Sequence, residues 1–70
     1  MKVRFSEHIT QSHREGILSE IVGMGATAER IDEDWYFITA AKPAWYAFAA
    51  EFLRGEQRLG NLELDESFMK

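Results

Sequence analysis

The sequence predicts a small α+β domain whose elements follow the order β-α-β-β-α-β. Three observations lead to this prediction. Apolar and polar residues alternate near both ends of the chain, two segments repeat apolar residues at helical spacing, and a stretch rich in aromatic and β-branched residues lies between them. A length of 70 residues is that of one domain.

The first strand and the first helix are predicted from residues 2–9 and 13–24. Residues 2–9 place apolar and polar side chains on alternate sides, which is typical of a strand with one buried face. Over residues 13–24, apolar side chains recur at spacings of three and four, as along one side of a helix. Ser12 and Glu15 have the spacing of a capping box, so we expect Ser12 to be the N-cap.

A β-hairpin is predicted for residues 26–31 and 35–40, joined by the acidic turn 32–34. The second of these segments is rich in aromatic and β-branched residues, which favour strands. The turn has no glycine, although glycine is typical of the tightest hairpins.

The second helix is expected to begin at Pro43, because proline has no N–H and the first turn of a helix does not need one. It is expected to end at Gly55 or at Gly60, with Tyr46 outside its apolar stripe. A short chain has few residues with which to build a core, so this stripe is expected to be buried. The stripe consists of Trp45, Phe48, Ala49, Phe52 and Leu53.

Residues 61–66 alternate again, and Leu62 and Leu64 predict a fourth strand. Phe68 and Met69 are expected to pack as a terminal clasp or to fray. With right-handed crossovers, the complete order gives a ferredoxin-like two-layer sandwich, with sheet order 4-1-3-2 and both helices on one face. Without the fourth strand, the fold is a three-stranded β-α-β-β-α sandwich.

Composition excludes several classes of protein. No cysteine is present, which excludes disulfides and thiolate metal sites. No apolar run has the length of a membrane span or of a signal peptide. A net charge of −4 opposes non-specific binding to nucleic acid and to anionic membranes. We therefore expect a cytoplasmic protein.

The excess acidic charge lies entirely in residues 31–70. In the expected topology, the turn between the second and third strands shares one edge of the sheet with the end of the fourth strand. Five carboxylates are then expected to form an acidic rim, namely Asp32, Glu33, Asp34, Asp65 and Glu66. Such a rim either keeps a small domain soluble or docks a positively charged protein.

The third strand is apolar on both faces, with Trp35 and Phe37 on one side and Tyr36 on the other. The helices cover only one face, so the other is expected to expose apolar side chains. Such a surface predicts an interface, of which a homodimer packed sheet to sheet is the simplest case. Alternatively, the long side chains of Lys2 and Arg4, or the C-terminal tail, lie over it.

No motif for catalysis or for cofactor binding is present. Gly23-Met24-Gly25 lies at a helix end, whereas phosphate-binding loops precede a helix. His8 and His13 are expected to be separate surface side chains rather than a catalytic pair. The acidic turn lacks the ligand spacing of a calcium loop. We expect a protein that is not an enzyme and that has no cofactor and no metal site.

The sequence therefore predicts a module that binds, and inhibits or modulates, a larger basic protein that handles nucleic acid. In size and charge it is similar to small acidic inhibitors of phages and other mobile elements, anti-CRISPR proteins among them, although no motif assigns it to a family. The expected partner-binding residues are Asp32, Glu33, Asp34, Trp35, Asp65 and Glu66. Two alternatives remain open: a homodimeric structural or regulatory domain that uses the open sheet face, and a single-stranded RNA binder in which Lys2, Arg4 and His8 flank the aromatic side chains.

Overall fold

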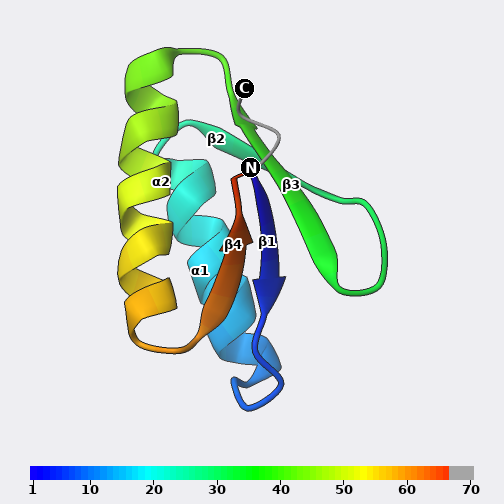
Figure 1. Cartoon of the computed structure of the whole chain (residues 1–70). Helices are drawn as coiled ribbons and strands as arrows, with labels where there is room; N and C mark the ends of the chain where they lie inside the picture. Colours follow the sequence, from blue (N-terminus) through cyan, green and yellow to red (C-terminus); the bar gives the residue numbers. More distant parts are fainter. Residues whose placement is uncertain (67–70) are drawn as a thin grey trace.

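The computed structural model describes residues 1–66, which contain the helices and strands that the sequence predicts, in the predicted order (Figure 1). Their bounds are β1 (Lys2–Phe5), α1 (Gln11–Gly23), β2 (Ala26–Arg30), β3 (Trp35–Ala40), α2 (Pro43–Arg58) and β4 (Leu62–Asp65). β1 is shorter than the predicted 2–9, and α2 continues through Gly55. The expectation for Phe68 and Met69 lies outside the described residues.

The four strands form one antiparallel sheet in the order β2-β3-β1-β4, which is the expected order 4-1-3-2 counted from the opposite edge. Both helices pack against the same face and share one core with the sheet (Figure 1). Because β4 is present and pairs with β1, the three-stranded alternative is wrong. The result is a small two-layer α+β fold, consistent with a ferredoxin-like sandwich.

The core lies between the sheet and the two helices. On β1, Val3 is buried while its neighbours Lys2 and Arg4 lie on the open face, as alternation along a strand requires. On β3, Tyr36 and Ile38 face the helices. The other buried apolar residues are Met1, Phe5, Ile9, Ile17, Ile21, Ala26, Ala49, Ala50, Leu53 and Leu62.

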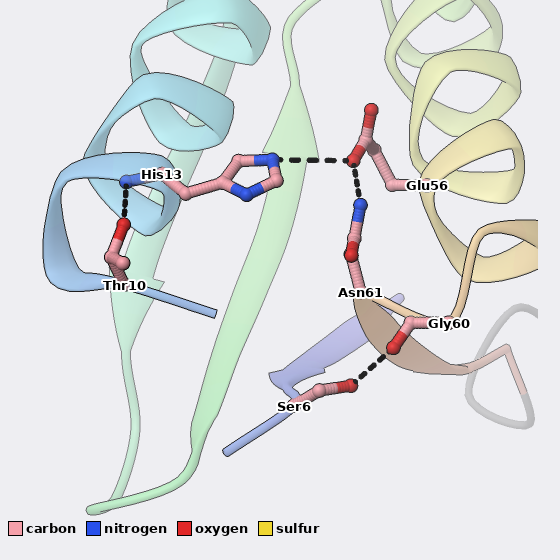
Figure 2. Close-up of polar contacts among 6 residues, drawn as sticks. All are labelled: Ser6, Thr10, His13, Glu56, Gly60 and Asn61. Atoms are coloured by element: carbon pink, nitrogen blue, oxygen red, sulfur yellow. Dashed lines mark hydrogen bonds and ion pairs between the residues drawn. The ribbon is translucent and has the colours of Figure 1, made fainter. Parts of the chain in front are cut away.

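Helix α1 begins two residues earlier than the sequence predicts. Its N-cap is Thr10, whose backbone is extended and whose Oγ1 accepts a hydrogen bond from the backbone N of His13 at 3.0 Å (Figure 2). Ser12 lies inside the first turn, so the expected capping box with Glu15 is wrong. The reason is that β1 ends at Phe5, which leaves enough chain for the helix to start earlier.

We expect Thr10→Ala to lower the free energy of unfolding by about 1 kcal/mol, because the N–H of His13 loses its acceptor. Ser12→Ala is the matched control and should change the free energy by less than about 0.5 kcal/mol. Urea denaturation followed by circular dichroism measures both changes. A larger loss for Ser12→Ala than for Thr10→Ala would contradict the assignment of the cap.

Helix α2 buries part of its predicted apolar stripe: Ala49 and Leu53 are buried as expected, and Phe52 packs against the core. Phe48 is 64% exposed and Trp45 is 37% exposed, so the expectation that the whole stripe is buried is wrong for both. Tyr46, expected outside the stripe, packs against the core. The buried residues of the helix are Ala49, Ala50 and Leu53. Small alanine side chains bring the helix close to the sheet, and this leaves the larger rings on its flank.

Candidate functional site

The acidic turn between β2 and β3 is held by its own hydrogen bonds. Oδ1 of Asp32 accepts from the backbone N of Asp34 and of Trp35, each at 2.9 Å. The guanidinium of Arg30 donates to the backbone carbonyls of Asp32 and Glu33, each at 3.1 Å. An aspartate that bonds the backbone two residues on is a turn-forming device in itself. The hairpin therefore closes without a glycine, and Glu33 and Asp34 are exposed.

The strand register separates the two halves of the expected acidic rim. Arg4 lies opposite Trp35 on one side and opposite Glu63 on the other. The turn that precedes Trp35 is therefore level with the start of β4, whereas Asp65 and Glu66 follow at its far end, near the N-terminus (Figure 1). A single rim of five carboxylates is wrong, because a turn and a strand end that were assigned to one edge lie at opposite ends of the sheet.

Asp65 and Glu66 are engaged in ion pairs of their own. Lys2 Nζ lies 3.7 Å from Asp65 Oδ2, and Arg54 donates to Glu66 at 2.7 Å. The hydrogen bond from Arg54 lowers the pKa of Glu66, with the positive charge of Arg54 and of the N-terminus acting in the same direction. These two carboxylates therefore join β4 to β1 and to α2.

A cleft at the turn end of the sheet gathers a different set of acidic side chains. Its volume is about 580 Å³, and it is lined by Arg4, Phe5, Ser6, Glu7, His8, Asp34 and Glu63. With the adjacent turn, these residues form a surface that we call the acidic end, defined as Glu7, Asp32, Glu33, Asp34 and Glu63. Three of its members were expected together, and the other two come from the β1–α1 loop and from β4.

The balance of charge at the acidic end is negative, since its five carboxylates face only two guanidinium groups, those of Arg4 and Arg30. Arg4 donates to Glu63 at 2.7 Å, and this hydrogen bond raises the pKa of Arg4, with further contributions from the charges of Glu63, Asp34 and Glu7. Sequence reasoning missed Glu7 because the first strand was drawn through it. Glu63 faces the open side of β4, and its pairing with Arg4, which also lies opposite Trp35, places it level with the turn.

The open face of the sheet is partly covered by the long side chains of β1. Lys2 Nζ lies 5.2 Å from the ring centroid of Trp35, and Arg4 Cζ lies 5.1 Å from it. Both distances are within the range of cation–π contacts. Trp35 is half-buried as a result. The alternative in which the long side chains of β1 lie over the aromatic face is therefore confirmed for Trp35.

A second cluster of polar side chains links α1 to α2 at the end of the sheet where the β2–β3 turn lies (Figure 2). His13 Nε2 of α1 lies 3.7 Å from Glu56 Oε1 of α2, and Asn61 donates to the same oxygen at 2.8 Å. On the neighbouring strand connection, Ser6 Oγ donates to the carbonyl of Gly60 at 2.7 Å. A carboxylate beside an imidazole can orient a general base, but the Thr10 hydroxyl lies at the helix cap and not at the ring.

The two histidines lie in different places, since His8 lines the cleft and His13 pairs with Glu56. Within residues 1–66, no three His, Asp or Glu side chains are grouped so that they could hold a metal ion. Neither helix of this part of the chain has the length and apolar character needed to span a membrane.

Comparison with protein-family models, with curated proteins and with solved structures gives no match to this chain.

Proposed function

We propose that the protein is a non-enzymatic binding module whose acidic end docks onto a basic surface of a larger protein and thereby inhibits or modulates it. The observation that carries this proposal is the convergence of Glu7, Asp34 and Glu63, from three separate segments, on one cleft beside the acidic turn. Broad basic surfaces are typical of proteins that contact the phosphate backbone. The partner we propose is therefore a cytoplasmic protein that handles nucleic acid.

The rigidity of the turn supports this function. Asp32 and Arg30 fix the turn backbone, so the exposed carboxylates of Glu33 and Asp34 need little ordering when a partner binds. Complementary charge of this kind mainly raises the association rate and selects the partner. Trp35 follows the turn directly and offers an apolar edge beside it. Asp65 and Glu66 are left out of the proposed surface, since they lie at the other end of the sheet.

A homodimer that uses the open sheet face is supported less well by these contacts. The face would have to bury Lys2 and Arg4 together with Trp35, and Arg4 is already paired with Glu63. Burying charged groups in an interface costs free energy unless every one is paired in good geometry.

Affinity capture from a lysate with three baits tests the proposal. The first bait is the native chain, and the second carries Glu7→Lys, Glu33→Lys and Asp34→Lys. Asp32 is kept, because its side chain holds the turn. We expect a partner that the native bait retains at low salt, and at least a tenfold loss, or about 1.4 kcal/mol, for the second bait.

The third bait is a matched control with the same change in net charge at exposed carboxylates elsewhere, Glu15→Lys, Glu29→Lys and Glu51→Lys. It should retain the partner as the native bait does. Equal loss with both variants would show that net charge alone attracts the partner, and equal capture with all three would remove the acidic end from the binding surface.

A further inference from the structure

The flank of α2 that borders α1 carries aromatic side chains that are only partly buried, although Phe52 also packs against the core. Phe48, Phe52 and Glu56 follow one another at spacings of four, so they lie along one side of the helix. Phe48 is largely exposed and Phe52 is half-buried. Trp45, three residues before Phe48, continues the row, and its ring lies against Gly25 in the connection between α1 and β2.

A groove of about 280 Å³ runs between this flank and α1, lined by His13, Gly16, Ile17, Glu20, Phe52 and Glu56. The α1 side of the groove is shallow at Gly16, because this residue has no side chain and nothing occupies the space around its would-be Cβ. Gly23, two turns further on, has the same open space. A backbone can approach α1 closely here while its side chains contact the rings of Phe48 and Phe52.

The charges around the groove are acidic. Glu20 lines it from α1 and Glu56 lines it from α2, with His13 beside Glu56. A second copy of the chain, placed by a two-fold axis, would bring these same carboxylates against one another. The complementary occupant is therefore apolar on one side and carries positive charge on its flanks.

We propose that this groove binds an amphipathic basic helix of a partner protein, with its apolar side against Phe48 and Phe52 and its Lys or Arg side chains beside Glu20 and Glu56. A helix fits because the groove lies between two helices and has no strand edge with which an extended peptide could pair. The α1 residues that line the groove run from His13 to Glu20, about two turns, which suits a segment of about three turns. This surface is separate from the acidic end and does not depend on it.

Binding of a synthetic peptide tests the proposal. The probe is an amphipathic helix of about four turns, with Leu at helical spacing and Lys at the other positions. Trp45 reports on binding in a Trp35→Phe background, where it is the only tryptophan. We expect a saturable blue shift of its emission and a Kd on the order of 10 µM. Absence of saturable binding would overturn the proposal.

Four variants in this background locate the peptide. Phe48→Asp and Gly16→Leu should each weaken binding at least tenfold, since the first removes an apolar contact and the second fills open space. Val22→Asp is the matched control, because Val22 is exposed but lies about 200° around α1 from Glu20. The triple Lys variant of the acidic end, made in the Trp35→Phe chain, should bind the peptide as tightly as the Trp35→Phe chain itself. Peptide binding at the groove therefore tests this proposal separately from the proposed function of the acidic end.

Two further outcomes decide the class of occupant. A proline in the middle of the peptide should abolish binding, because it breaks a helix, and unchanged binding would contradict a helical occupant. Sedimentation of the native chain should show a monomer. A dimer that Phe48→Asp dissociates would mean that a second copy fills the groove, and the proposal would then be wrong.

Discussion

We expect Gly25→Ala to lower the free energy of unfolding by about 3 kcal/mol. This loss is the sum of the cost of a left-handed backbone conformation and the cost of a steric clash. Gly25 has a φ of +93°, a conformation that residues with a side chain rarely adopt. A Cβ at this position would stand 2.7 Å from Cδ2 and 3.0 Å from Cγ of Trp45. Because Cγ is among the atoms in contact, a rotation about χ2 alone does not relieve the clash, and Trp45 must change its χ1 rotamer or α2 must shift.

Gly60→Ala is the control that separates the two causes. Gly60 has a φ of +81°, but nothing lies within 4 Å of its would-be Cβ. We expect this variant to lose only the backbone part, about 1–2 kcal/mol. Urea denaturation of both variants, followed by circular dichroism, measures the difference. Equal losses would show that the Trp45 ring moves aside, and the contact between the start of α2 and the end of α1 would then be a loose one.

The second large effect is expected at Leu53, whose side chain is fully buried between α2 and the sheet. Leu53→Ala should lower the free energy of unfolding by about 2–5 kcal/mol, since it removes apolar contacts and leaves a cavity. A domain of 70 residues has on the order of 4–10 kcal/mol in total. The variant is therefore expected to show a melting temperature lowered by well over ten degrees in circular dichroism.

Phe48→Ala is the informative control for this prediction. Both residues belong to the apolar stripe that the sequence predicts, yet Phe48 is mostly exposed. Its removal should change the free energy of unfolding by less than about 0.5 kcal/mol, as for other surface positions. If Phe48→Ala were as costly as Leu53→Ala, the side of α2 that faces the core would have been assigned wrongly, and Phe48 would not be available to a partner beside the groove.

Periodicity predicted the elements well because each of them depends mainly on local pattern. Alternation identified β1 and β4, proline marked the start of α2, and the order of elements led to the observed order of strands. The sequence predicted the burial of Ala49 and Leu53 on α2, but not the exposure of Trp45 and Phe48. Tyr46, Ala49 and Leu53 share one side and Trp45, Phe48 and Phe52 share another, and hydrophobicity alone favours the aromatic one. Close packing against the sheet favours the side with alanines.

The candidate site shows the same division between local and long-range information. The acidic turn was recognisable, because Asp32, Glu33 and Asp34 are consecutive. Its neighbours depend on the pairing of Arg4 with Glu63, which are 59 positions apart. In this topology β3 and β4 run parallel, because both are antiparallel to β1, so the start of β4 and not its end lies level with the turn. The single rim expected from the sequence placed the wrong end of β4 there. Glu7 became visible only once β1 was seen to end at Phe5.

The position of β1 in the middle of the sheet also bears on how the chain folds. β2 and β3 form a hairpin with a short turn, but β1 must pair with β4 across about sixty residues, a separation that slows folding even where it costs little stability. On a ribosome, β1 is made before the other three strands of this sheet but is among the last of them to have both edges paired. Until β4 has emerged, Val3 and Phe5 lie on a strand with one edge unpaired, and the nascent chain is most open to aggregation during that interval.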